Sequence, residues 1–232
     1  MKAVVWIVEA QACAFNSGHA ALWLSHTESL RLAAIARPQR ARQYLFCRYV
    51  LRCALSCWLY GTASQWQDVV LDGEPGVAPV WQGCLLATQR PLYLSLSHSA
   101  TWVGCAVAEA PIGIDIELQM DRQRDIPAIL SWIGSTAESD ACMLAPEISQ
   151  ASFLRLWCAK EAAFKWASAS GRVPSFQEID TLSEQVAGLP VNLFSQSERI
   201  AGQDIYWSLC TERPVSLELH KRFPGDKPQK IG

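Results

Sequence analysis

Strand-like and helix-like segments follow one another in this chain without a regular β-α-β rhythm, and this irregular order restricts the possible folds most strongly. Alternating residues predict successive strands over residues 92–99, 101–109 and 112–117. Apolar residues at helical spacing predict helices over 126–133 and 150–169, and on both sides of Pro38 within 29–61. No sequence repeat is visible. We therefore expect an α+β fold in place of a doubly wound parallel sheet.

Composition limits the class of protein. The 232 residues suffice for one large domain or two modest ones, and 50% apolar with 18% charged residues is typical of a globular chain. The net charge of −2 argues against a nucleic-acid-binding protein, which usually carries a positive excess. Six of the 14 arginines nevertheless lie between Leu30 and Gln67, a stretch without Asp or Glu. The sequence thus predicts a local basic patch within a nearly neutral protein.

The first residues and the cysteines bear on location. The start "MKAVVWIVEAQACA" resembles a signal peptide, but Glu9 cuts its apolar run short, so a first strand is the favoured interpretation. No run approaches the roughly 18 apolar residues that span a bilayer. The nine cysteines contain no C-x-x-C pair, which favours reduced thiols in the core of a cytoplasmic protein.

The segment "PIGIDIE", Pro111 to Glu117, places two carboxylates in an apolar strand. Side chains at i and i+2 leave the same face of a strand, so Asp115 and Glu117 point in the same direction. Like charges this close repel each other. Either the pair is solvated at an edge strand, or a positive group lies between the two acids.

The segment "LWCAKEAAFKW" predicts a helix in which Glu161 and Lys165 share one face. An ordinary surface ion pair explains these two residues equally well. Lys160 adds a second ammonium, and bulky aromatic neighbours indicate that much of this helix is packed against other parts of the protein. Charged groups are rarely buried in such surroundings unless they are paired.

The segment "SLSHSATWVGC" contains His98 in a polar turn, where a histidine is more often structural than catalytic. Because Ser97 and other serines flank it, His98 is also a candidate donor around an anion. The chain contains no G-x-S-x-G elbow, P-loop or G-x-G-x-x-G motif.

Taken together, "SLSHSATWVGCAVAEAPIGIDIE" and the later "WCAKEAAFK" resemble the ordered motifs of 4'-phosphopantetheinyl transferases, specifically the surfactin-type group. The resemblance runs from about Arg37 to Lys165. It implies two similar α+β halves related by a pseudo-two-fold axis, with the active site between them. We expect residues 1–110 to form the half that binds the 3'-phosphate of coenzyme A and residues 111–232 to carry the metal ligands and catalytic helix.

The resemblance also implies a cofactor and a co-substrate. Mg²⁺, with Mn²⁺ as a substitute, is expected on Asp115, Glu117 and Glu161, and such a hard cation takes carboxylate oxygens and bridges to phosphate. The metal is then the positive group between the two acids. Glu161 is the expected base and Lys165 the expected stabiliser of charge on the diphosphate. The expected contacts to coenzyme A are Arg40, Arg42, Arg48, Ser97, His98 and Lys160.

The implied reaction transfers 4'-phosphopantetheine from coenzyme A to a serine of an apo carrier protein, releasing adenosine 3',5'-bisphosphate. The carrier would serve fatty-acid, polyketide or peptide synthesis, and we expect a cytoplasmic monomer that binds neither nucleic acid nor membrane. The G-K-P or G-A-P element of the family has no clean match in "GEP" or "GVAP", so no adenine contact is carried over. A metal-dependent phosphoesterase and a non-catalytic carrier-binding module are the alternatives.

Overall fold

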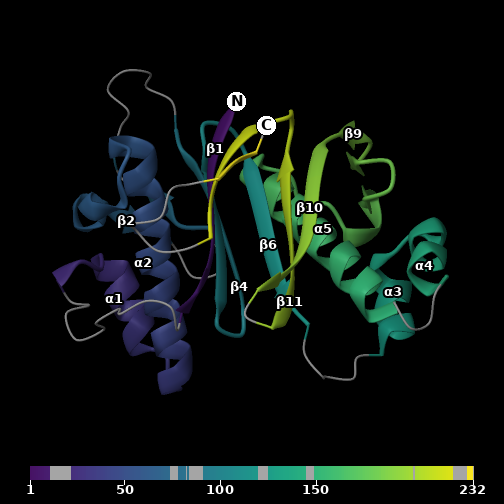
Figure 1. Cartoon of the computed structure of the whole chain (residues 1–232), viewed down its shortest axis with the longest axis horizontal. Helices are drawn as coiled ribbons and strands as arrows, with labels where there is room; N and C mark the ends of the chain where they lie inside the picture. Colours follow the sequence, from purple (N-terminus) through teal and green to yellow (C-terminus); the bar gives the residue numbers. More distant parts are fainter. Residues whose placement is uncertain are drawn as a thin grey trace. The chain divides into compact units, whose positions relative to one another are not determined.

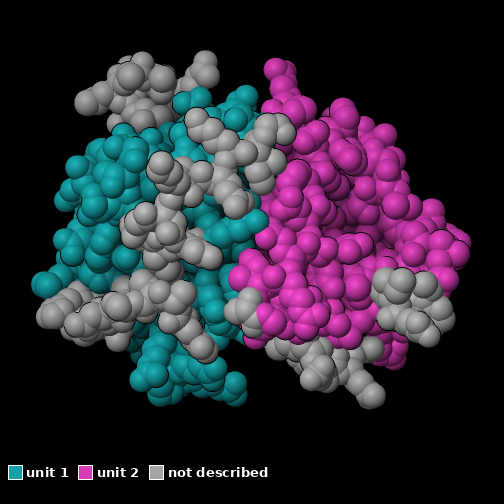
Figure 2. All heavy atoms as spheres, viewed as in Figure 1, with its two compact units in different colours: residues 1–110, 215–232 teal, residues 111–214 magenta. Residues whose placement is uncertain are grey.

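The computed structural model describes residues 1–10, 22–73, 78–81, 83, 91–119, 125–144, 149–200, 202–221 and 229–231. The chain forms two compact units, unit 1 (residues 1–110 and 215–232) and unit 2 (residues 111–214) (Figure 2). The sequence-based division also lies between Ala110 and Pro111. The structure differs in that it groups the last 18 residues, from Val215 on, with unit 1.

Unit 1 is built on a sheet with the strand order β13-β12-β1-β5-β4. β1 pairs antiparallel with β5 and parallel with β12, so the beginning of the chain and the segment after residue 215 form neighbouring strands. The expected first strand is confirmed, as are the two strands on either side of the turn at Ala100 and Thr101. The strands are β1 (Lys2–Glu9), β4 (Tyr93–Ser99), β5 (Trp102–Ala108), β12 (Ser216–His220) and β13 (Gln229–Ile231).

Two helices lie on either side of the Pro38 position, as the sequence predicts: α1 (His26–Ala33) and α2 (Pro38–Tyr60). Pro38 suits the first turn of α2, where its missing N–H costs no hydrogen bond, and Gly61 ends the helix with a left-handed φ of 72°. α2 packs along this sheet (Figure 1). Its buried side chains, such as Val50 and Leu55, belong to the hydrophobic core of unit 1. The shorter elements that follow are η3 (Ala63–Asp68), β2 (Leu71–Asp72) and β3 (Val80–Trp81).

A buried ion pair fixes α1 to α2. Glu28 forms a capping box with Ser25 at the start of α1, and its carboxylate also receives two hydrogen bonds from Arg52, at 3.1 and 2.5 Å. Arg52 is fully buried and also donates to the carbonyls of Val69 and Trp23. Because a buried charge is tolerated only when it is paired and hydrogen-bonded, part of the arginine patch has a structural role.

Unit 2 is built on a three-stranded antiparallel sheet in the order β10-β11-β6 and the long helix α5 (Figure 1). The chain passes from β6 (Ile112–Leu118) through α3 (Ile126–Ile133) and α4 (Thr136–Met143) to α5 (Ser149–Ala169). After α5 come η5 (Phe176–Glu178) and the short strands β7 (Ile179–Asp180), β8 (Gln185–Val186) and β9 (Leu189–Pro190). The hairpin of β10 (Asn192–Ile200) and β11 (Gln203–Thr211) completes the sheet.

The core of unit 2 lies where α5 packs on this sheet. Ala162, Ala163 and Trp166 of α5 are buried together with Cys210 of β11. The mixture of helices packed on mainly antiparallel sheets confirms the expected α+β class, while the pseudo-two-fold relation between halves stays a prediction. None of the helices in the described part of the chain has the length and apolarity needed to cross a membrane.

Candidate active site

A close contact between β6 and α5 positions the acids of "GIDIE". Gly113, Asp115 and Glu117 share one face of β6 because side chains alternate along a strand. A Cβ atom at Gly113 would lie 1.9 Å from the carbonyl oxygen of Ala162 and 2.5 Å from the backbone nitrogen of Trp166. Gly113 therefore allows the α5 backbone to approach the strand directly beside Asp115.

Helix α5 directs Glu161 and Lys165 from one face. The two residues are four apart, and 3.6 residues per turn puts them one above the other. Glu161 and Lys165 are both partly buried, which an isolated surface ion pair does not require.

Lys165 reaches from α5 to β6 and pairs with Asp115. Its Nζ lies 2.7 Å from Asp115 Oδ1 and 3.1 Å from the carbonyl oxygen of Ile114. The Asp115 side chain is only 6% exposed and that of Lys165 is 27% exposed. In this structure the positive group beside the acid pair is thus the ammonium of Lys165, and the bond joins strand to helix instead of running along the helix to Glu161.

Electrostatics place Glu161 near the same acids. Burial raises the pKa of the Glu161 carboxyl, the Lys165 ammonium opposes this shift, and the negative charges of Asp115 and Glu117 add to it. Burial, and to a smaller extent the same two carboxylates, raise the pKa of the Cys158 thiol well above its ordinary value. β6 and α5 therefore bring the three predicted metal ligands into mutual electrostatic contact.

These three carboxylates fit a hard divalent cation in donor chemistry. They supply only oxygen ligands, and their mutual repulsion is of the kind that a bound cation relieves. Within the residues that the structure describes, no three acidic, histidine or cysteine side chains are already arranged closely enough to hold a metal ion. The donor set thus fits Mg²⁺, while the ammonium of Lys165 neutralises Asp115 in the present arrangement.

Two of the expected coenzyme ligands meet in unit 1. Arg40, near the start of α2, places its Nη1 2.8 Å from Nε2 of His98 at the end of β4, although 58 residues separate them. Gln43 helps to fix this contact, because it accepts from Arg40 and donates to the carbonyl of Ala100 in the β4–β5 turn. Ser97 precedes His98 on β4.

The other two expected arginines differ in exposure. Arg42 is exposed on α2. Arg48 is 6% exposed, its guanidinium carbon lies 5.0 Å from the centre of the Tyr44 ring, and its Nε lies 3.6 Å from a carboxylate oxygen of Glu28. A phosphate would have to reach Arg48 inside this packed environment, so Arg40 is the more accessible candidate.

Comparison with known proteins identifies the region that holds the acids. Residues 111–213 match the model of the 4'-phosphopantetheinyl transferase superfamily. This part of the chain belongs to that superfamily. The family predicted from the motifs is confirmed, and the surfactin-type subgroup stays a prediction.

Curated relatives agree with the superfamily match. A 4'-phosphopantetheinyl transferase of Bacillus subtilis is 34% identical over 83 residues, which cover 36% of this chain and 36% of the relative. The fatty acid synthase alpha subunit pkiB of Emericella nidulans is 37% identical over 180 residues, which cover 66% of this chain and 10% of that subunit. The matched part of the chain therefore spans about a third of the length of the Bacillus subtilis relative and about a tenth of the length of the fatty acid synthase subunit.

Lys160, within the superfamily region, takes a different role from the expected coenzyme contact. Its side chain is fully buried, its Nζ lies 2.9 Å from Glu138 Oε2, and it donates to the carbonyl oxygens of Phe176 and Ile179. These partners engage all three ammonium protons, so the structure corrects the expectation: Lys160 ties α5 to α4 and β7. The Phe176 ring strengthens this connection, because it stacks on Trp157 and Phe164 of α5.

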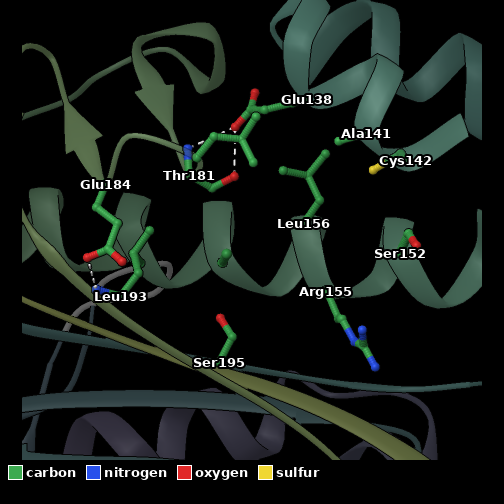
Figure 3. Close-up of a pocket in the computed structure, with 12 residues that line it drawn as sticks. Glu138, Ala141, Cys142, Ser152, Arg155, Leu156, Thr181, Glu184, Leu193 and Ser195 are labelled. Atoms are coloured by element: carbon green, nitrogen blue, oxygen red, sulfur yellow. Dashed lines mark hydrogen bonds between the residues drawn. The ribbon is translucent and has the colours of Figure 1, made fainter. Parts of the chain in front are cut away.

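A pocket of about 500 Å³ lies on another face of α5 (Figure 3). Arg155, Leu156 and Ala159 line it, as do Glu138 of α4 and Ser195 of β10, and none of the predicted site residues does. At 100° per residue these α5 positions lie roughly opposite the face of Glu161 and Lys165. The superfamily helix therefore separates this pocket from the acids.

Sequence reasoning missed two residues that fix the packing of α5. Gly113 was visible only as part of "GIDIE", and nothing in a single sequence shows how closely a helix will approach it. Glu138 had a signal, because Ser135 and Glu138 have the S-x-x-E spacing of a capping box, and the structure contains that box. The second partner of Glu138, the buried Lys160, follows from tertiary packing alone.

Proposed function

We propose that this chain is a surfactin-type 4'-phosphopantetheinyl transferase that moves the 4'-phosphopantetheine group of coenzyme A to a serine hydroxyl of an apo carrier protein. The serine oxygen forms a bond to the β-phosphorus, and the bond from that phosphorus to the bridging oxygen breaks. Adenosine 3',5'-bisphosphate leaves with the electron pair. The superfamily match and the name of the Bacillus subtilis relative support transfer as the activity, and the site residues make it chemically feasible.

The observation that carries this proposal is the convergence of Asp115 and Glu117 from β6 with Glu161 and Lys165 from α5. It lies within the superfamily region and brings three acids and one cation together beside a helix backbone contact at Gly113. A purely structural ion pair would need one acid and one base.

Asp115, Glu117 and Glu161 are the residues that would hold Mg²⁺, or Mn²⁺ in its place. When bound, the ion supplies positive charge that binds and polarises the diphosphate of coenzyme A.

The chain's own side chains do the remaining work of phosphoryl transfer, which is mainly positioning and charge stabilisation. The Glu161 carboxylate takes the proton from the serine hydroxyl. The Lys165 ammonium, one turn further along α5, stabilises negative charge on the phosphates. The packed α5–β6 contact holds both groups at fixed positions.

Unit 1 supplies the coenzyme contacts in this proposal. Arg40 and His98 are close enough to bind one phosphate group together, with Ser97 beside them. Arg42 and Arg48 extend the basic patch along α2, and the patch is proposed to take the 3'-phosphate of coenzyme A.

The proposed partner is an apo acyl carrier protein or a carrier domain of a fatty-acid, polyketide or peptide synthase. The similarity to the fatty acid synthase alpha subunit of Emericella nidulans supports a carrier of fatty-acid synthesis as the partner. We propose a monomer that acts in the cytoplasm without nucleic acid or membrane.

The test incubates the protein with coenzyme A, Mg²⁺ and a panel of apo carrier proteins, and measures each carrier's mass. The expected result is a mass gain of one phosphopantetheine on at least one carrier, and its loss when the acceptor serine is replaced by alanine. Release of free 4'-phosphopantetheine without any carrier would instead support a phosphoesterase. Carrier binding without a mass gain would support a non-catalytic binding module.

The variant Glu161→Gln tests the assigned role within this assay. It preserves the shape of the side chain but removes a metal ligand and the base, so we expect near-complete loss of transfer that extra Mg²⁺ does not restore. Glu212→Gln, an exposed position of unit 2, is the control for the same change of charge. If Glu161→Gln turns over within about threefold of the unmodified protein, the mechanism is wrong.

A further inference from the structure

The ammonium of Lys165 and a metal ion would compete for Asp115, because Lys165 contacts an oxygen of this expected metal ligand. Lys165 Nζ lies 2.7 Å from Asp115 Oδ1 and is held in place by a second bond, at 3.1 Å, to the carbonyl of Ile114. The ammonium is therefore seated on the strand backbone and on the acid together. A side chain that only awaited a phosphate would not need this backbone contact.

The packing around this contact gives the acid little freedom to move away. Asp115 is 4% exposed on a strand whose neighbour Gly113 would bring a Cβ to 1.9 Å from the α5 backbone. A divalent cation bound to Asp115 would sit about 2.1 Å from its oxygen. An ammonium on the same carboxylate would then lie within a few ångströms of the ion, where like charges repel strongly.

We infer that Lys165 is an internal counter-ion, which neutralises Asp115 while no metal is bound and leaves Asp115 when a divalent cation binds. This inference rests on the proposed function, since the released ammonium is the group proposed to stabilise the coenzyme phosphates. Lys165 thus lowers the affinity of the free protein for the cation. Cation binding and the freeing of Lys165 become one event.

The balance of charge supports an exchange of cations over a permanent ion pair. Asp115, Glu117 and Glu161 supply three carboxylates, whereas Lys165 supplies one ammonium, which lies 2.7 Å from Asp115. A divalent cation carries twice the charge of that ammonium and would compensate the acids more fully, which favours displacement of the monovalent group.

The test measures Mg²⁺ binding to the purified full chain by calorimetry without coenzyme A, and repeats it with Mn²⁺ by electron paramagnetic resonance. Lys165→Met removes the charge and retains much of the side-chain volume. A neighbouring unit charge shifts the proton affinity of a carboxylate by about 1–3 pK units, so we expect the variant to bind Mg²⁺ at least about tenfold more tightly. Asp115→Asn added to Lys165→Met should abolish this gain.

The matched control is Arg155→Gln, which makes the same change of net charge at an exposed position of α5. It should leave Mg²⁺ affinity within about twofold. If Lys165→Met does not fold, as judged by circular dichroism, Lys165→Gln replaces it. Equal or weaker Mg²⁺ binding by the lysine variant, or no binding by any form, overturns the inference.

This outcome is separate from that of the proposed function. Tighter Mg²⁺ binding by Lys165→Met in a protein that transfers nothing to any carrier would support the exchange and reject the transferase. Normal transfer by the unmodified chain, with Mg²⁺ affinity unaffected by the variant, would keep the transferase and reject the exchange.

Discussion

Replacing Gly113 by alanine tests whether the approach of α5 to β6 sets the geometry of the site. The added Cβ would lie 1.9 Å from the Ala162 carbonyl oxygen, and an ordinary contact begins near 3.4 Å. Because the opposing atoms are backbone, no side chain can rotate away. The helix and strand must separate by about 1.5 Å to restore ordinary contact.

The magnitude follows from this displacement. Overpacking a core usually costs about 1–3 kcal/mol, and for a chain of this size each kcal/mol lowers the melting temperature by roughly 2–4 °C. A separation of about 1.5 Å would also stretch the 2.7 Å bond between Lys165 and Asp115 beyond hydrogen-bonding distance. Since a misplacement of about 1 Å can cost a hundredfold in rate, we expect at least that loss of transfer.

Two assays check this prediction: thermal unfolding followed by circular dichroism, and carrier mass gain over time at saturating coenzyme A. Gly134→Ala is the control, because its Cβ would meet a serine hydroxyl at 3.0 Å and a carbonyl at 3.1 Å, a milder crowding away from the acids. It should leave the rate within a few-fold. A Gly113→Ala variant with unchanged melting temperature and rate would refute the packing argument.

Three further predictions concern other charged groups. Arg40→Ala should weaken the binding of coenzyme A by about tenfold or more, and the binding of dephospho-coenzyme A much less, as measured by calorimetry. The control variant Arg37→Ala should affect the binding of neither ligand. Equal losses of affinity for both ligands in Arg40→Ala would contradict the prediction. Glu138→Ala leaves Lys160 as a buried charge without its acidic partner, so the free energy of unfolding measured in urea should fall by about 3–5 kcal/mol. A fall of less than about 1 kcal/mol would contradict the structural role of this ion pair. Burial lowers the pKa of His220 from its ordinary 6.5, although Glu218 opposes this shift. Below that pH the unfolded chain therefore binds more protons than the folded chain. The free energy of unfolding should thus fall as the pH drops from about 6.5 to 5. In His220→Phe, the free energy of unfolding measured in urea should depend less on pH over this range. An unchanged pH dependence would argue against a contribution from His220.

Local elements followed directly from the sequence. Pro38 and Gly61 bound α2, the alternation around His98 gave β4, and helical spacing gave α3. Each rests on interactions between residues near in sequence, which a single chain displays. The α+β class followed from their order.

The partners of the charged groups did not follow. Glu161 and Lys165 share a helix face as predicted, yet Lys165 forms a salt bridge with Asp115, which is 50 residues away in the sequence. Lys160, adjacent to Glu161, turns to Glu138 and the backbone beyond α5. Which of two neighbouring lysines is buried depends on how α5 packs, and packing joins residues that no local pattern connects.

The parallel pairing of β1 with β12 has a consequence for how the chain acquires its structure during synthesis. Unit 2 is one continuous segment of the chain, while unit 1 is made from two segments on either side of it. On a ribosome, β1 emerges first and pairs with β5 early, but its other edge waits for a strand more than 200 residues later. Residues 111–214 can fold during that interval, and chains that stop after Pro214 would leave an open strand edge exposed to pairing with other chains.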